Sequence, residues 1–290
     1  EHGARYAPGP IPLTGLYKRV SDESAQGKYE VLAPPVLRKV PIFDVNRTSS
    51  TPFTPGQIRV PDTFTSEIYA STLVEIDPSA VGALPYPTVT GPFFDLESLP
   101  SDIHPAFRFW VVQDTSQGGD GGRVIDDLTA NGANGRSPVR EKLHLPSLDD
   151  FVAMVGYMNK LCPDKVWGVP HLFKRDLRKA FRQVPGHPDS RKWAAFAVRN
   201  PETRLLEVFQ HMSLPFGGRA SPILFCAVAQ VLCEVAAHHL GIPMSAFVDD
   251  FFAAVPSSLS RSCFDKFRWL VQDLLGLHLK TEKDKDPAPS

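Results

Sequence analysis

The sequence has little cysteine and no excess of charge of either sign. Its 290 residues include four cysteines, and no two of them form a Cys-x-x-Cys pair. This argues against a zinc knuckle or a disulfide scaffold and favours a reducing, intracellular compartment. Lys and Arg number 31 against 32 Asp and Glu, so the formal net charge is -1. Any contact with a polyanion such as nucleic acid must therefore come from a local basic patch.

A long uninterrupted hydrophobic run is also missing. The most apolar stretch, residues 222–240, is broken by Gln230 and Glu234 and ends in His238 and His239. It predicts a buried helix rather than a membrane span, and we expect no membrane partner. No signal-peptide pattern is recognised at the start of the sequence. The histidines have no ligand spacing with cysteine or carboxylate, so they are not predicted to bind a metal.

The distribution of proline divides the chain. Half of the 28 prolines lie before residue 101, between short apolar runs. Residues 1–103 are therefore predicted to be a Pro-rich N-terminal extension, either poorly ordered or docked as a subdomain. From residue 104 onward, helical and β-rich patterns alternate without a strict βαβ repeat, which predicts an α+β fold.

The pattern of individual elements supports this class. Two β-rich runs, residues 107–112 and 123–128, flank a glycine-rich tip and predict a hairpin. Ser147 is a candidate N-cap for a helix whose first turn is acidic. Further strands are expected at residues 166–173, 193–198 and 205–212, and an apolar run at 244–255. Helices are expected at residues 221–239 and 263–275, the second ending at Gly276.

Three aspartates stand out because they follow or interrupt runs that would otherwise be core strands. Asp176 follows the run 166–173, and Asp249 and Asp250 interrupt the run 244–255. A carboxylate in such a place needs either a tight turn or a cation to offset its lost hydration. Carboxylates from two strand ends would hold two divalent ions for phosphoryl transfer.

Four segments resemble a known family. DLRKAFRQVP (176–185), LPFGGRASP (214–222), FVDD (247–250) and LGLHLKTEK (275–283) are similar, in order and spacing, to palm motifs A to D of reverse transcriptases. Upstream, RVIDDL (123–128) and LPSLDD (145–150) resemble segments of the same enzymes. The resemblance covers residues 105–290. It implies a right-hand palm and fingers without a thumb, the fingers at about 104–165 and 186–212 and the palm at about 166–185 and 213–290.

The resemblance implies an RNA-directed DNA polymerase of a retroelement, an intracellular nucleotidyltransferase. Its partners would be an RNA template, a DNA or RNA primer and a dNTP. Its cofactors would be two Mg²⁺ ions, with Mn²⁺ as a substitute. The implied metal ligands are Asp176, Asp249, Asp250 and the carbonyl of Leu177. Lys283 would donate a proton to the departing pyrophosphate.

The resemblance also implies how substrates are bound. Phe181 would be the steric gate against a ribose 2′-OH, while Phe216 and Gly217 would lie against the incoming nucleotide. Arg123 would grip the triphosphate, with Arg108 on the opposite strand as a further candidate. A basic stretch beside the site supplies Arg178, Lys179 and Arg182 for the nucleic-acid backbone.

Two alternatives compete with this interpretation. A viral RNA-dependent RNA polymerase shares the palm and the two-metal chemistry, but Phe181 and Val248 argue against it. A catalytically inactive reverse-transcriptase-like domain would instead serve as an RNA-binding scaffold. Such a domain is expected to have lost carboxylates, whereas all three aspartates are present here.

Overall fold

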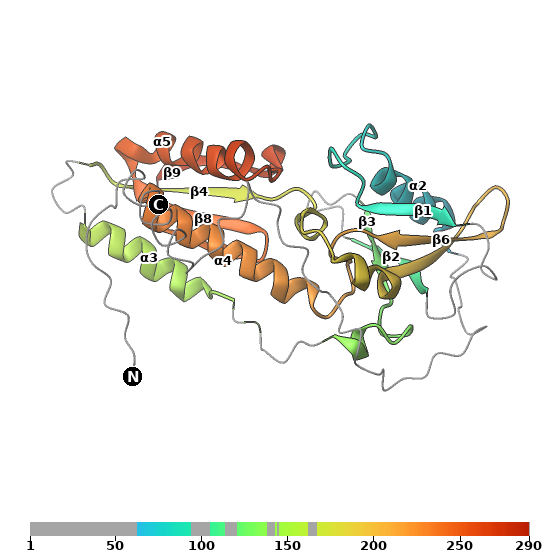
Figure 1. Cartoon of the computed structure of the whole chain (residues 1–290). Coiled ribbons are helices and arrows are strands. Elements are labelled where there is room, and N and C mark those ends of the chain that lie inside the picture. The colour runs from blue at the N-terminus through green and yellow to red at the C-terminus, as the bar shows by residue number, and fades with distance from the viewer. Residues whose placement is uncertain are drawn as a thin grey trace, which may run out of the picture. The chain divides into compact units, whose positions relative to one another are not determined.

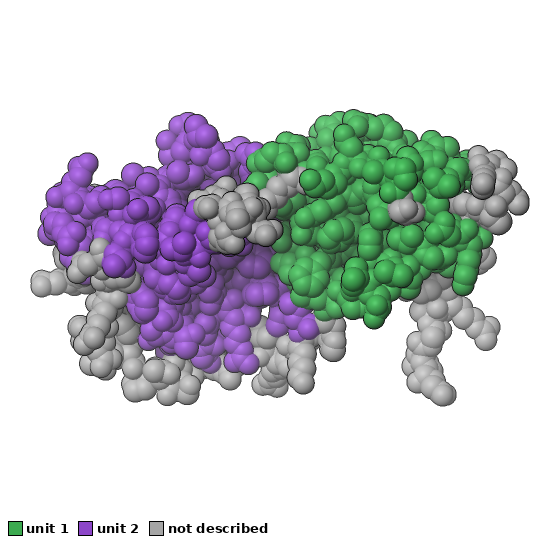
Figure 2. Space-filling view, turned by 180° about the vertical axis from the view of Figure 1, so that it is seen from behind, with its two compact units in different colours: residues 1–36, 144–177, 226–290 green, residues 37–143, 178–225 purple. Residues whose placement is uncertain are grey.

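The computed structural model describes residues 63–93, 105–113, 121–137, 143, 145–161 and 167–289 (Figure 1). These residues divide into two compact units (Figure 2). Within the described ranges, unit 1 runs over 145–177 and 226–289, and unit 2 over 63–143 and 178–225. Residues 178–185 and 213–225, which the sequence assigns to the palm, thus lie in unit 2.

Unit 1 contains a four-stranded antiparallel sheet in the order β7-β8-β4-β9. The strands are β7 (Met244–Phe247), β8 (Asp250–Pro256), β4 (Pro170–Asp176) and β9 (Lys285–Pro289). The apolar run 244–255 is therefore a hairpin, β7 and β8. The strand expected at 166–173 is shifted toward the C-terminus, because pairing with β8 extends over the charged residues Lys174, Arg175 and Asp176.

Helices cover both faces of this sheet (Figure 1). Neighbouring residues in a strand point to opposite faces, so Phe251 and Phe252 in β8 show which helix lies where. Phe251 meets Phe267 of α5 (Ser257–Arg268), with ring centroids 5.3 Å apart. Phe252 meets Phe151 of α3 (Leu148–Leu161) at 5.6 Å. The core of unit 1 therefore has one layer on each side of the sheet.

The ends of these helices test the predictions from sequence. Ser147 caps α3 as predicted: the N–H of Asp150 donates to its Oγ at 3.3 Å, and Oδ2 of Asp150 accepts from the N–H of Ser147 at 2.7 Å. This reciprocal pair is a capping box. The predicted start of the last helix at residue 263 was wrong. Helix α5 begins at Ser257 and continues as a π-helical segment, η5 (Trp269–Leu274), before Gly276 takes a φ of 68°.

Helix α4 (Ser221–Leu240) forms where a buried helix was predicted, and it is buried along one face. Phe225, Ala229, Leu232 and Ala236 recur at helical spacing and are almost inaccessible. Val231 on the other face is 61% exposed. Among the helices that the structure describes, α4 alone has the length and apolar composition to cross a membrane, a test that core helices also pass.

Unit 2 contains a five-stranded sheet in the order β1-β6-β5-β2-β3. The strands are β1 (Val89–Phe93), β6 (Leu206–His211), β5 (Ala195–Arg199), β2 (Ala106–Val112) and β3 (Gly122–Asp126). The hairpin predicted from the sequence, β2-β3, is confirmed, and the strands expected at 193–198 and 205–212 pair with each other as β5 and β6. Part of the Pro-rich extension also belongs to this unit, because β1 pairs with β6 and α2 (Thr65–Ile76) packs beside the sheet. Residues 1–62 lie outside the described part.

Candidate active site

The backbone of unit 1 brings motifs A, C and D together at one end of the sheet. Asp176 is the register partner of Asp250, and the N–H of Leu177 donates to the carbonyl of Asp249 at 3.2 Å. The carbonyl of Asp176 in turn accepts from the N–H of Lys280 at 2.7 Å. The three predicted aspartates therefore occupy adjacent backbone positions where β4 ends and β8 begins.

The tight turn between β7 and β8 sets the position of Asp249. Val248 precedes it with a φ of 57°, in the left-handed region that β-branched residues rarely adopt. Phe247 and Asp250 close the hairpin as register partners, so the turn holds two residues. Unfavourable backbone conformations of this kind cluster at functional sites.

The side chains of the three aspartates do not form a complete metal site, although their backbone positions are adjacent. Asp250 forms an ion pair with Lys174, with Nζ 2.7 Å from Oδ1, and both side chains are about one-third exposed or less. In the part of the chain that the structure describes, no three His, Cys, Asp or Glu side chains stand in a metal-binding arrangement. The carboxylates of Asp176, Asp249 and Asp250 are the oxygen donors that Mg²⁺ prefers, and Asp250 also pairs with Lys174.

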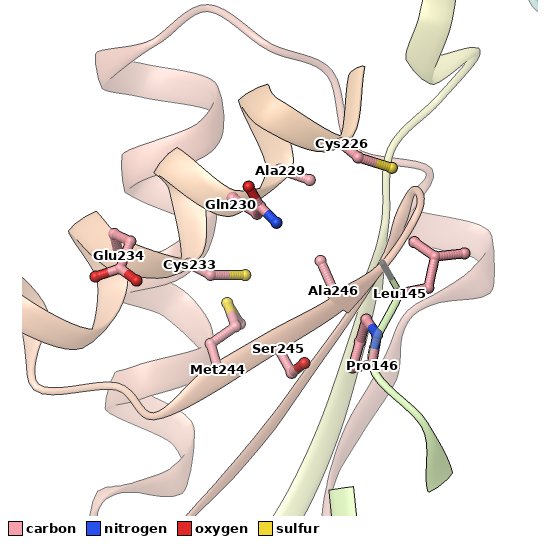
Figure 3. Close-up of a pocket in the computed structure, with 10 residues that line it drawn as sticks. All are labelled: Leu145, Pro146, Cys226, Ala229, Gln230, Cys233, Glu234, Met244, Ser245 and Ala246. Atoms are coloured by element: carbon pink, nitrogen blue, oxygen red, sulfur yellow. The ribbon is translucent and has the colours of Figure 1, made fainter. Parts of the chain in front are cut away.

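The environment of Asp249 includes the thiol of Cys226 in α4. Burial and, secondarily, the negative charge of Asp249 raise the pKa of that thiol. Cys226 also lines a pocket of about 170 Å³ between α4, β7 and Leu145-Pro146 (Figure 3). Burial raises the pKa of Cys233, which also lines this pocket, to about 12. These thiols are protonated at neutral pH, so the pocket does not carry a cysteine nucleophile.

Two of the predicted nucleotide-binding residues meet in unit 2. The rings of Phe181 and Phe216 lie 5.1 Å apart, and Phe225 lies 5.4 Å from Phe181. Phe181 and Phe216 are only partly buried. The structure therefore gathers aromatic rings from motifs A and B into one partly accessible cluster.

The structure shows why residue 217 is a glycine, which the sequence alone did not reveal. Its φ is 93°, and a Cβ atom there would lie 2.0 Å from the carbonyl oxygen of Asp126. The N–H of Asp126 donates to the carbonyl of Phe216 at 3.3 Å, and Asn134 Nδ2 donates to the carbonyl of Gly217 at 3.0 Å. The glycine thus allows the motif B loop to approach strand β3.

The predicted basic residues differ in their accessibility. Arg123 in β3 is exposed, and Arg178 and Lys179 are partly buried. Arg182 and Arg108 are almost wholly buried, at 1% and 0% exposure, and neither guanidinium can reach a nucleic-acid backbone or a triphosphate. The backbone of Lys283 lies in the short helix η6 (Thr281–Lys283), while its side chain lies outside the described part.

The two buried arginines belong to a charge network in unit 2. Arg108 donates from Nε and Nη2 to the carboxylate of Asp126 at 2.8 and 3.2 Å, and its Nη1 lies 2.9 Å from Glu75 Oε2. Arg182 Nε lies 2.8 Å from Glu75 Oε1. Two cations and two carboxylates therefore balance one another away from water.

His211 completes this network, although the sequence marked it as unremarkable. Arg182 Nη1 lies 2.7 Å from its Nδ1, and its Nε2 lies 2.7 Å from Asp126 Oδ2. An arginine can only donate, so Nδ1 accepts and Nε2 carries the proton. This is the neutral tautomer, in agreement with burial, which lowers the pKa of His211 to about 4. Neither Glu75 nor His211 carried a local sequence signal, because their partners lie in distant segments.

Comparison with known proteins matches the same region. The family model described as reverse transcriptase (RNA-dependent DNA polymerase) matches residues 138–285, slightly more than half of the 290-residue chain. The chain belongs to the reverse transcriptase family. The match spans motifs A to D and therefore includes Asp176, Phe181, Phe216 and Asp249. The mixed helices and sheets described above agree with the palm and fingers fold of reverse transcriptases.

Two curated relatives come from endogenous retroviruses. The chain is 29% identical to the Pol polyprotein of Feline endogenous virus ECE1 over 118 residues, which are 40% of this chain and 11% of that protein. It is 30% identical to the Gag-Pol polyprotein of Baboon endogenous virus (strain M7), again over 118 residues, which are 40% of this chain and 6% of that protein. The matched residues make up 11% and 6% of these two relatives, so the chain spans a small part of their length.

Proposed function

We propose that the chain is an RNA-directed DNA polymerase that extends a primer by template-directed nucleotidyl transfer. The observation that carries this proposal is the strand register in unit 1. It pairs Asp176 with Asp250 and joins Leu177 to Asp249 through a backbone hydrogen bond. The membership of the reverse transcriptase family supports the same conclusion.

Asp176 and Asp249 are the residues that would hold the divalent ions, with the Leu177 carbonyl as a further oxygen ligand. Two bound Mg²⁺ or Mn²⁺ ions would favour deprotonation of the primer 3′-hydroxyl and neutralise charge on the departing pyrophosphate. Asp250 contributes mainly through its ion pair with Lys174, which keeps that lysine next to the carboxylates. Lys283 is the candidate proton donor to the pyrophosphate.

Phe181 and Phe216 are proposed to bind the sugar and base of the incoming dNTP. Their rings lie 5.1 Å apart, and both residues are partly accessible. A fixed aromatic ring leaves no room for a 2′-hydroxyl, and this would select deoxynucleotides. Gly217 keeps the motif B loop close to β3, and the exposed Arg123 on the same strand is available for the triphosphate.

Arg178 and Lys179 remain candidates for contacts with the RNA template or the DNA or RNA primer, because both are partly accessible. Arg182 is assigned a different role, since it is buried against Glu75. We further propose an intracellular location. The described cysteines, Cys226, Cys233 and Cys263, are free thiols, which supports a reducing compartment.

The test is primer extension with dTTP on poly(rA) annealed to oligo(dT), in Mg²⁺. Asp249→Asn removes a proposed metal ligand and is expected to lower the rate at least about 100-fold. The matched control is Asp149→Asn, a change of the same chemistry in the first turn of α3. Equal rates in the Asp249 variant and the control would contradict the proposed role.

A second candidate function is an inactive RNA-binding scaffold. The ion pair between Lys174 and Asp250 favours it, because the lysine already neutralises one carboxylate of the proposed metal site. The scaffold predicts RNA binding without dTTP incorporation in Mg²⁺ or Mn²⁺. The polymerase predicts incorporation that Asp249→Asn abolishes while RNA binding persists.

A further inference from the structure

We propose that Glu75, on helix α2, is a positioning residue for nucleotide selection. Its ion pair with Arg182 holds the short helix η3 (Ala180–Gln183), which carries Phe181. This inference rests on the proposed role of Phe181 at the nucleotide sugar. It adds a residue that lies upstream of the region matched by the family model.

The chain geometry links Glu75 to Phe181 in two steps. Arg182 directly follows Phe181, and its guanidinium lies 2.8 Å from Glu75 in an ion pair and 2.7 Å from Nδ1 of His211. The ring of Phe181 itself meets Phe216 and Phe225. Aromatic ring contacts contribute little energy each, whereas a buried cation strongly requires a nearby counterion. The direction in which Phe181 points therefore depends on the anchoring of Arg182.

Glu75 is the carboxylate on which this anchor depends. Its Oε1 faces Arg182 and its Oε2 faces Arg108, and its side chain is 7% exposed. Arg108 has a second carboxylate, Asp126. In the part of the chain that the structure describes, Glu75 is the carboxylate that forms an ion pair with Arg182. Without its charge, Arg182 would be a buried cation that has lost its directly paired carboxylate, and it would shift toward water, carrying Phe181 with it.

The experiment measures kcat/KM for dTTP and for UTP with the full chain on poly(rA) annealed to oligo(dT). Glu75→Gln is expected to lower the dTTP-to-UTP ratio about 10-fold, because a displaced Phe181 admits the 2′-hydroxyl. The matched control is Glu67→Gln, an exposed residue on the same helix, which should leave the ratio unchanged. A Glu75→Gln variant that loses dTTP and UTP use by the same factor would overturn the inference.

A double-mutant cycle tests whether the effect passes through Phe181. Phe181→Ala is expected to lower the ratio by itself. Glu75→Gln should then cause no further loss of selectivity in the Phe181→Ala background, because residues that act through one contact are not additive. An equal loss in both backgrounds would place the effect of Glu75 elsewhere and reject the proposal.

A second variant tests the proposal in case Glu75→Gln does not fold. Glu75→Gln combined with Arg182→Met removes both charges of this ion pair. The variant therefore leaves no buried arginine without its paired carboxylate. This variant is expected to fold and still to show the reduced dTTP-to-UTP ratio. A ratio equal to that of the unchanged chain would refute the positioning role.

Amide hydrogen exchange separates this inference from the proposed function, since it requires no polymerase activity. Residues 178–185 should exchange faster in Glu75→Gln than in Glu67→Gln. If the unchanged chain does not incorporate dTTP, the polymerase proposal fails, and exchange still tests the anchor. Unchanged exchange in residues 178–185 would reject the anchor whatever the activity.

Discussion

His211 shows how one buried side chain can make stability depend on pH. Burial lowers its pKa to about 4 in the folded chain, against an ordinary value of 6.5. Between these two values the unfolded chain binds a proton that the folded chain does not, so stability falls as the pH decreases. We predict a loss of about 2 kcal/mol between pH 7 and pH 5, measured by urea unfolding.

The matching substitution is His211→Gln, which retains one donor and one acceptor but does not titrate. This variant should make the free energy of unfolding nearly independent of pH between pH 7 and pH 5. The control is His238→Gln on the exposed face of α4, where the side chain is 51% exposed. A dependence that survives His211→Gln would show that another group is responsible.

Gly217 provides a second test of a single residue. Gly217→Ala would place a Cβ atom 2.0 Å from a backbone oxygen, and backbone cannot move aside as a flexible side chain can. We predict a destabilisation of about 3 kcal/mol in urea unfolding. Gly241→Ala is the control, because Gly241 also has a positive φ, 65°, but has nothing within 4 Å of the added atom. Similar losses in both variants would attribute the effect to the backbone conformation alone.

At this scale, the sequence predicted residues whose surroundings are local and missed those whose partners are distant. The capping role of Ser147 needed only the three residues that follow it. Arg182 was assigned to nucleic acid because its neighbours in the chain are basic, yet its counterion is Glu75 in another segment. A buried ion pair between distant segments leaves no periodic signal in the sequence.

At the scale of elements, the β7-β8 hairpin has an unfavourable turn. Val248 adopts a φ of 57°, which costs a β-branched residue about 1 kcal/mol or more. Asparagine tolerates this conformation, so Val248→Asn is predicted to raise the free energy of unfolding by about 1 kcal/mol. Urea unfolding measures this, with Val231→Asn on the exposed face of α4 as the control. A Val248→Asn variant that is less stable than the unchanged chain would contradict the interpretation.

Patterns of hydrophobicity identified most elements but not all of their limits. The β2-β3 hairpin and the strands β5 and β6 were predicted because β-rich runs flank turn residues. The strand β9 was not predicted, because residues 285–289 are charged and rich in proline and gain strand structure by pairing with β4. The early start of α5 was missed for a related reason, since its first turn is serine-rich rather than apolar.

At the scale of the whole molecule, the region upstream of the family match contributes to the fold of unit 2. Strand β1 covers the edge of β6, and α2 supplies Glu75 to the buried charges. A chain shortened to residues 104–290 would expose that edge and remove the carboxylate that pairs with Arg182. We predict that it loses cooperative urea unfolding, while a chain of residues 63–290 keeps it. Equal unfolding of the two shortened chains would contradict this role.

The measurement that tests the central claim most directly is incorporation of dTTP by the full chain on poly(rA) annealed to oligo(dT), with Mg²⁺ and with excess EDTA. The arrangement of Asp176 and Asp249 at the ends of paired strands predicts incorporation that requires Mg²⁺ and stops when it is chelated. Binding of the annealed template and primer without incorporation in Mg²⁺ would contradict the account.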